Sequence, residues 1–271
     1  KSSKIYDFYH MMLVAYRELQ GDYEGILDAI GEAEKLLAEG VLNELWFNKR
    51  FNNYIKVYAY LRLGMLEEGL NHSIRHLNSY NEGSNNWLAY LENYVILALH
   101  KKDYHLAVEL YALAKGKTVS SLPKVQEVWG LIGRFICLVC DHTKIPCNLT
   151  DLRKEPEIAL ISKDKEGYNL PLLILEYLEN LPKLDEEDMV QYAARFSKYT
   201  SKYLRDDAAA RARLFIKLLL LSMKEEGEKL QEKSAPVLVE LKNTPPPRDP
   251  IAEVEIVPYE HLWDLVLELL Q

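Results

Sequence analysis

Cysteine and glycine are both scarce in this chain of 271 residues. Three cysteines cannot form the disulfide framework of a small secreted protein, so a reducing, cytoplasmic setting is expected. Only 12 residues are glycine and 48 % are hydrophobic, a balance typical of helical globular proteins. Apolar runs such as Leu218 to Leu221 are too short for a transmembrane helix. The sequence therefore excludes a disulfide scaffold and predicts no membrane association.

Basic residues are also fewer than acidic ones. The chain has 33 basic and 41 acidic residues, a net charge of -8, and no basic block. Binding to a phosphate backbone needs clustered Lys and Arg, and the pair Arg211 and Arg213 is too small, so nucleic acid is not an expected partner. The N-terminus, KSSKIYDFYH, lacks the basic start and apolar core of a signal peptide, and it lacks an initiating methionine. We therefore expect a processed form or part of a longer protein.

Catalytic motifs are missing as well. The sequence has no phosphate-binding loop, nucleophile elbow or paired metal-ligand motif. We therefore expect no enzymatic activity and no cofactor. A helical enzyme whose catalytic groups come from distant positions stays open as an alternative.

The clearest pattern that is present runs from Leu91 to Lys115. Apolar residues recur at three- and four-residue spacing up to Leu99, and again from Tyr104 onward. Between them, Lys101 to Asp103 interrupt the pattern. So short a break predicts two antiparallel helices, a hairpin that cannot bury its own apolar face and needs neighbours.

Similar helical spacing covers most of the chain. The expected helices are 6–20, a second one that ends before Gly40, 43–62, 66–80, 125–140, 169–181, 189–204, 208–226, 228–241 and 261–270. Helix 228–241 is interrupted by Pro236, which should kink or end it. Residues 252–257 alternate between apolar and polar and predict one short strand, although no second strand is evident.

The residues that follow the turns recur at a regular step. Tyr23, Leu66 and Tyr104 are separated by 43 and 38 residues, and Trp129 lies 38 residues after Leu91. A recurring step in this range is the signature of stacked helical pairs.

Several of these positions resemble the tetratricopeptide repeat (TPR). The resemblance rests on Gly21-Asp22-Tyr23, on Tyr104 with Ala107, Tyr111 and Ala114, and on Trp129-x-x-Ile132-Gly133-x-x-Ile136. It covers roughly residues 5–140, with departures at Ile26 and Gly69, where the family favours alanine, and at His76. What the resemblance implies is a divergent, right-handed α-solenoid of stacked hairpins that binds a protein or peptide along a concave groove.

The expected organisation has four segments. They are TPR-like repeats over 1–140, an irregular insertion over 141–168, further hairpins of the same solenoid over 169–243, and 244–271 with a Pro-rich linker, the short extended segment and a capping helix. The apolar final helix needs a partner surface. It either caps the solenoid or docks on a sister chain, so a homodimer through the C-terminal helix is a further expectation.

Two sets of residues carry the types of side chain that bind metal ions. Cys137, Cys140, His142 and Cys147 have ligand-type side chains, but Cys137 and Cys140 lie in an apolar helical run where cysteine behaves as a small buried hydrophobe. His72 and His76 stand one helical turn apart without a third ligand beside them. We interpret both sets as structural and expect no metal site.

The first helix of each hairpin should line the concave surface. Aligning the turns places eight residues on that side: Met11, Tyr54, Tyr58, Arg62, Glu92, Ile96, His100 and Arg134. Tyr54, Tyr58 and Arg62 share one stripe, and Tyr and Arg often dominate binding energy. Alternatively, these tyrosines are core residues between adjacent hairpins.

The function expected from these patterns is a non-enzymatic scaffold that binds a protein or peptide. A regulatory or sensor module, which controls an effector domain within a longer chain, is the second hypothesis.

Overall fold

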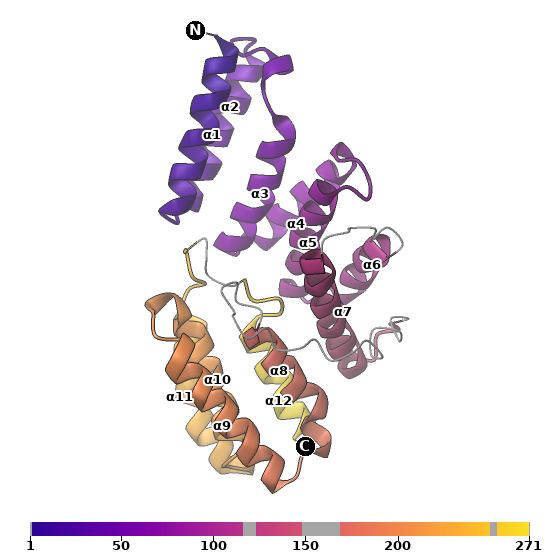
Figure 1. The fold of residues 1–271 in the computed structure, drawn as a ribbon, viewed down its shortest axis with the longest axis vertical. Helices are drawn as coiled ribbons and strands as arrows, with labels where there is room; N and C mark the ends of the chain where they lie inside the picture. The colour runs from indigo at the N-terminus through magenta and orange to yellow at the C-terminus, as the bar shows by residue number, and fades with distance from the viewer. Residues whose placement is uncertain (1, 116–122, 148–168, 250–253, 271) are drawn as a thin grey trace. The chain divides into compact units, whose positions relative to one another are not determined.

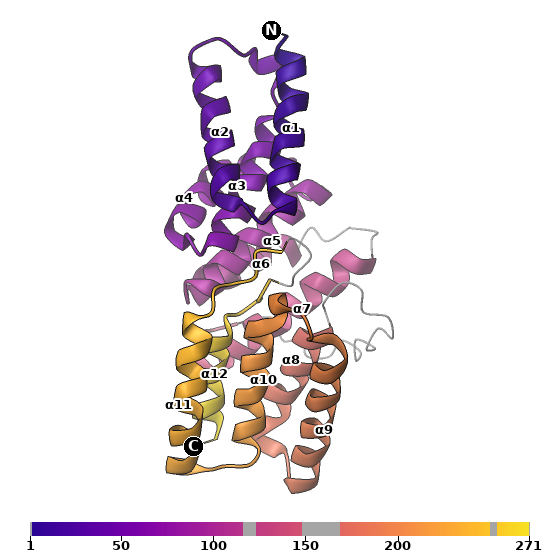
Figure 2. The same cartoon turned by 90° about the vertical axis from the view of Figure 1, so that its left-hand side faces the viewer.

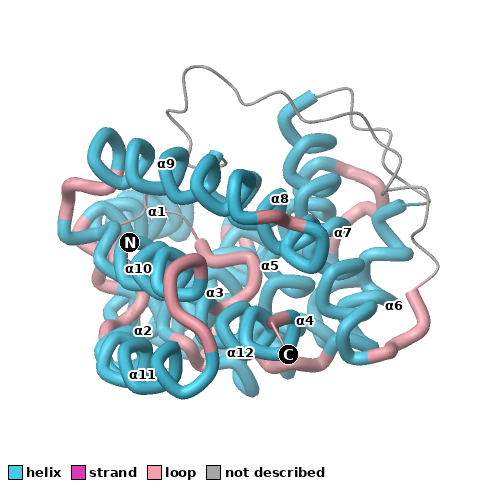
Figure 3. Tube along the Cα trace, turned by 90° about the horizontal axis from the view of Figure 1, so that it is seen from below, coloured by secondary structure: helices cyan, strands magenta, loops and turns pink. Residues whose placement is uncertain are grey.

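The computed structural model describes residues 2–115, 123–147, 169–249 and 254–270. Helices make up 80 % of these residues, and they contain no strand (Figure 3). The expected all-α class is therefore confirmed. The chain divides into two compact units, which we call unit 1 (Lys1–Pro123 and Arg248–Ile251) and unit 2 (Lys124–Pro247 and Ala252–Gln271). None of the described helices combines the length and apolar character that a membrane span requires.

The described residues of unit 1 form six α-helices, which are labelled in Figure 1. They are α1 (Ser3–Leu19), α2 (Tyr23–Ala38), α3 (Lys49–Leu63), α4 (Leu66–His76), α5 (Asn85–His100) and α6 (Tyr104–Lys115). Each helix packs on the next one along the chain, and α3 also contacts α5. Packing between consecutive helices is the arrangement of a helical repeat.

The turns inside the three hairpins of unit 1 are very short. Gly21 and Gly64 both have φ +66°, a left-handed conformation that glycine adopts without steric cost. After Gly21, the Asp22 carboxylate accepts a hydrogen bond from the backbone N–H of Gly25 at 2.9 Å and so starts α2. Asp103 likewise accepts from Leu106 N at 3.1 Å and starts α6. The turns that the sequence predicted at these places are confirmed.

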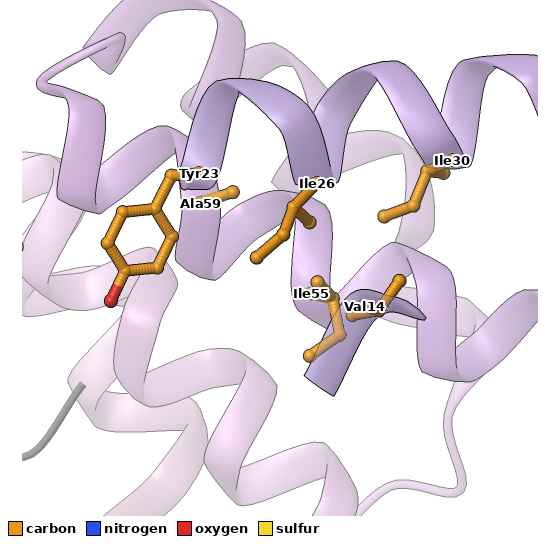
Figure 4. Close-up of a cluster of buried hydrophobic side chains, with 6 residues drawn as sticks. All are labelled: Val14, Tyr23, Ile26, Ile30, Ile55 and Ala59. Carbon is orange, nitrogen blue, oxygen red and sulfur yellow. The ribbon is translucent and has the colours of Figure 1, made fainter. Parts of the chain in front are cut away.

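The core of the first three helices is a cluster of apolar side chains (Figure 4). Its buried members are Val14 of α1, Tyr23, Ile26 and Ile30 of α2, and Ile55 and Ala59 of α3. Burial of each large apolar side chain stabilises the unit by about 1.5–3 kcal/mol. Helix α2 is therefore held between α1 and α3 by packing.

Helix α3 begins later than the sequence pattern indicated. The apolar spacing predicted a helix from Asn43, but α3 starts at Lys49. The Asn43 side chain instead caps a short 3-10 helix, η1 (Glu44–Trp46), by accepting from Leu45 N at 2.9 Å. Asn48 then caps α3 by accepting from Phe51 N at 3.0 Å. The two asparagine caps thus divide this stretch into a short 3-10 helix and a separate α-helix.

Unit 2 contains the remaining helices (Figure 1). They are α7 (Pro123–Thr143), α8 (Asn169–Asn180), α9 (Glu186–Tyr203), α10 (Ala210–Ser222), α11 (Gly227–Asn243) and α12 (Tyr259–Leu269); the first residue of α7 belongs to unit 1. Short 3-10 helices follow α8, as η4 (Leu181–Lys183), and precede α10, as η5 (Asp207–Ala209). A further one, η2 (Leu77–Ser79), follows α4 in unit 1. Helices α8 to α11 again pack in chain order, and α12 lies against α10 and α11 (Figure 2). Its side chains Leu262, Trp263 and Val266 are buried inside unit 2.

One expectation for this half of the chain is decided in part, and another needs correction. Helix α11 runs through Pro236, so of the two expected effects, a kink or an end of the helix, the end does not occur. The strand expected over 252–257 is not formed in its described part, Val254 to Val257. A strand needs a neighbour, and here Glu255 instead binds Arg211 and accepts from Tyr259 N at 2.9 Å. Residues 148–168 of the expected insertion lie outside the described residues.

A charged network joins the helices of unit 2 around Arg211. Its guanidinium is buried and donates to the carboxylates of Glu255 and Glu260 and to the carbonyls of Leu241 and Thr244. This single side chain of α10 therefore holds the end of α11, the segment before α12 and the first turn of α12.

A short segment after the Pro-rich stretch belongs to unit 1. Arg248 donates to both oxygens of Glu24, at 2.9 and 2.7 Å, in the first turn of α2. Its backbone passes so close to the α1–α2 turn that a Cβ added to Gly21 would lie 2.5 Å from the Arg248 carbonyl oxygen. We call this contact the Arg248 strap.

Candidate functional site

The eight residues predicted to line a concave surface lie in both units. Seven of them, on α1, α3 and α5, belong to unit 1, and Arg134 on α7 belongs to unit 2. Arg62 and Ile96 are buried; Met11, Tyr54, Tyr58, Glu92, His100 and Arg134 are half-buried. Six of the seven unit 1 members lie on α3 and α5, which pack against each other, whereas Met11 lies on α1.

Tyr58 and Arg62 contact each other, and Tyr58 also packs against Tyr23 of the unit 1 core. The Arg62 Nε–H donates to the Tyr58 hydroxyl at 3.1 Å, and the guanidinium lies 5.1 Å from the Tyr58 ring centre. The Tyr58 and Tyr23 rings pack edge to face at 5.7 Å, with their hydroxyls 3.4 Å apart. These contacts place both side chains in the α2–α3 packing.

Tyr54, one turn earlier on the same helix, lines a pocket of about 540 Å³. The pocket lies between the beginnings of α3 and α5, and its wall is made of Asn48, Arg50, Phe51, Tyr54, Tyr80, Asn86 and Ala89. Apolar rings, amide groups and a cation surround it. A largely apolar lining with a few polar groups is typical of ligand-binding pockets.

The electrostatics of the pocket keep its phenols neutral. Burial raises the pKa of Tyr54, and the negative charge of Glu92 raises it further. Burial likewise raises the pKa of Tyr80, whose hydroxyl donates to the Arg50 carbonyl at 2.6 Å. The Arg50 side chain is exposed at the rim. The pocket therefore offers hydroxyl and amide groups and one positive charge to a ligand.

Arg134 has a structural partner in unit 2. Its guanidinium binds both carboxylate oxygens of Glu179, with an Nε–Oε1 distance of 3.2 Å. The pair links α7 to α8.

The cysteine candidates are close together, whereas the histidine proposed with them points elsewhere. The sulfur atoms of Cys137 and Cys147 are 3.9 Å apart, and burial, followed by the neighbouring thiol of Cys147, raises the pKa of Cys140. His142 Nε2 instead contacts the Glu268 carboxylate of α12. No group of three or more His, Cys, Asp or Glu in the described part of the chain could hold a metal ion.

The second pair of candidates, His72 and His76, lies on one face of α4 with the two rings tilted by 40°. Their ring centres are 4.4 Å apart. Burial, followed by the charge of His76, lowers the pKa of His72 to about 4, and burial also lowers the pKa of His76. Both rings are therefore neutral at physiological pH, as expected of interior histidines.

Sequence reasoning missed the outer face of α1. The apolar spacing predicted a helix over 6–20 without showing which of its faces is covered. In the structure Tyr9, Met12 and Tyr16 are 58–63 % exposed, and the buried residues of α1 are His10 and Val14. The sequence did hold a signal for this exposed face. Apolar residues surround most of the circumference of α1, whereas a helix that buries one face needs apolar residues on that face alone.

Comparison of the chain with protein-family models, curated proteins and solved structures found no match.

Proposed function

We propose that this protein is a non-enzymatic binding scaffold that holds a peptide, or an exposed segment of another protein, in the Tyr54 pocket of unit 1. The proposal includes the divergent TPR-like architecture, a right-handed α-solenoid, and a cytoplasmic setting without nucleic acid or membrane partners.

The observation that carries the proposal is the position of the pocket. It lies where α3 approaches α5, and these are the first helices of two successive hairpins. The TPR resemblance implies that first helices line the binding surface. At about 540 Å³ the pocket falls in the range of ligand-binding pockets, about 300–1,000 Å³.

The lining also supports a peptide rather than a small metabolite. Asn48 already uses its side-chain oxygen to cap α3, while its exposed neighbours Arg50 and Asn86 stand at the rim. Rim groups of this kind suit the backbone and an acidic side chain of an extended chain segment. The recognised peptide would therefore carry an apolar or aromatic residue next to an acidic one.

The test is selection of binders from a random peptide library on the immobilised chain, followed by affinity measurements on variants. Ala89→Leu fills the pocket, and Arg50→Glu reverses its charge. Each should weaken the selected peptides at least about tenfold, a loss of 1.4 kcal/mol. Arg75→Glu, an exposed arginine on α4, is the matched charge control and should bind normally.

Failure would take one of two forms. If the library yields no peptide that binds the chain, the scaffold proposal is wrong. If peptides bind all three variants equally, the Tyr54 pocket is not the site.

A further inference from the structure

The outer face of α1 is an uninterrupted apolar stripe. Between Lys4 and Gln20, every exposed residue of this helix is apolar or aromatic. The stripe consists of Ile5, Phe8, Tyr9, Met12, Ala15, Tyr16 and Leu19. Its largest members are strongly exposed, from 58 % for Tyr16 to 75 % for Leu19. Successive residues of an α-helix are rotated by about 100° around its axis, so the stripe covers roughly 120° of the circumference and is centred on Met12.

The stripe is symmetric along the helix. Its residues fall in pairs at equal distances before and after Met12. The pairs are Ile5 with Leu19, Phe8 with Tyr16, and Tyr9 with Ala15. A second copy of α1, antiparallel and related by a two-fold axis at Met12, would bring each residue to the level of its pair member. Large Tyr9 would then lie at the level of small Ala15, which leaves room for the ring.

Charge does not oppose this pairing. The only charged side chain that is exposed on α1 is Lys4, which lies beyond the end of the stripe. In the antiparallel arrangement it reaches the level of Gln20 of the second copy. Contact between two such faces therefore buries no like charges, in a protein of which 27 % of the residues are charged.

The exposed area also fits a dimer. With side-chain areas on the order of 150–250 Å² for aromatic residues, the exposed parts of the six large side chains sum to roughly 700 Å². That exceeds the largest apolar patch of a typical monomer, about 300–600 Å². It approaches the roughly 800 Å² per partner that a stable interface buries.

From these observations we propose that the chain forms a symmetric homodimer through α1, with the two helices antiparallel about Met12. The proposal is independent of the Tyr54 pocket, and it assigns the dimer to the first helix rather than to the C-terminal one.

The first test is the molar mass in solution, measured by light scattering at about 100 µM, a concentration that populates even a dimer with a micromolar Kd. The wild-type chain should have about twice the monomer mass of 31.4 kDa. Met12→Glu places two carboxylates at the two-fold axis and should raise the dimer Kd at least about 100-fold, without loss of helical signal. Ile74→Glu is the matched control, because Ile74 on α4 is 65 % exposed and Met12 is 63 % exposed.

The second test is the direction of the helices. Met12→Cys should cross-link to itself under mild oxidation. Ile5→Cys and Leu19→Cys should cross-link when mixed with each other and not alone, with wild type as the control for the native cysteines. A monomeric wild type, a Met12→Glu variant that dimerises like Ile74→Glu, or self-cross-linking of the Ile5→Cys protein would overturn the proposal.

Discussion

Replacing Arg211 by methionine tests the charged network of unit 2. Methionine keeps the unbranched apolar stem of the side chain and removes the guanidinium. In the native structure this group makes six hydrogen bonds, four to the carboxylates of Glu255 and Glu260 and two to backbone carbonyls. The side chains of Arg211 and Glu255 are only 8 % and 10 % exposed. Water therefore cannot replace the lost donors without rearrangement of the helices.

The expected cost is large. Removing one partner of a buried ion pair leaves the other charge uncompensated, which costs about 3–5 kcal/mol. Whole domains are stable by only about 5–15 kcal/mol, so this change removes a third or more of a typical margin. Arg211→Lys should fall between wild type and Arg211→Met, because an ammonium group cannot bind two carboxylates in a fork.

The penalty should depend on pH. Burial raises the pKa of Glu255, and the guanidinium opposes this rise. Without Arg211 the pKa rises further. A carboxyl whose folded pKa lies above its unfolded value binds an extra proton on folding, so its contribution to stability is present at low pH and is lost as the pH rises through the folded pKa. The destabilisation by Arg211→Met should therefore be smaller at pH 5 than at pH 8.

Amide hydrogen exchange is the appropriate assay, because it resolves the two units. The slowest amides of α10 and α12 should exchange roughly 10² to more than 10³ times faster in Arg211→Met, whereas those of α2 and α5 should be unchanged. Adding Glu255→Gln to the variant removes the buried charge and should recover part of the protection. If the variant loses less than about 1 kcal/mol at pH 8, or loses the same amount at both pH values, the network does not stabilise unit 2 as argued.

Three further predictions concern other positions. Gly69→Val should lower the free energy of unfolding by about 1–3 kcal/mol, because a Cβ there would lie 2.9 Å from two methyl carbons of α5. Gly31→Val should cost much less, because a Cβ at Gly31 would have nothing within 4 Å, and thermal melts compare the two variants. Arg248→Ala should raise the pKa of Glu24, now lowered first by its hydrogen bonds to that arginine, toward its ordinary value in a carboxyl NMR titration; an unchanged pKa would mean that the strap does not form in solution. Because burial raises the pKa of Cys140, this thiol should alkylate at pH 8 far more slowly in the folded than in the unfolded protein, as read by mass spectrometry, and equal rates would contradict the burial.

The helical hairpins of unit 1 were predictable because their signals are local. Three- and four-residue spacing, a glycine in the turn and an aspartate that caps the next helix all fall within one short window, as at Gly21 and Asp22. The start of α3 was not predictable from spacing. Apolar residues continue on both sides of Asn48, and only the hydrogen bond of its side chain to Phe51 N decides where the helix begins.

The functional surfaces were less predictable because they depend on distant contacts. Apolar spacing identified α1 as a helix but could not show which of its faces is covered. Nothing in the local sequence distinguishes Arg211 from Arg213, since the carboxylates that surround Arg211 lie more than 40 residues away. Tyr54 was predicted as a side chain of the first-helix surface, and that prediction stays untested; the pocket that it lines also needs Tyr80 and Ala89, which only the fold brings beside it.

The Arg248 strap has a consequence for how the protein is made. Unit 1 is not continuous in sequence: its last residues follow residues 124–247, which belong to unit 2. A ribosome adding about 5–20 residues per second therefore completes the helices of unit 1 on the order of ten seconds before Arg248 is synthesised. During that interval the α1–α2 turn is uncovered and Glu24 has no arginine to bind. Unit 1 thus reaches its final form only after residues 124–247, which belong to unit 2, have been synthesised.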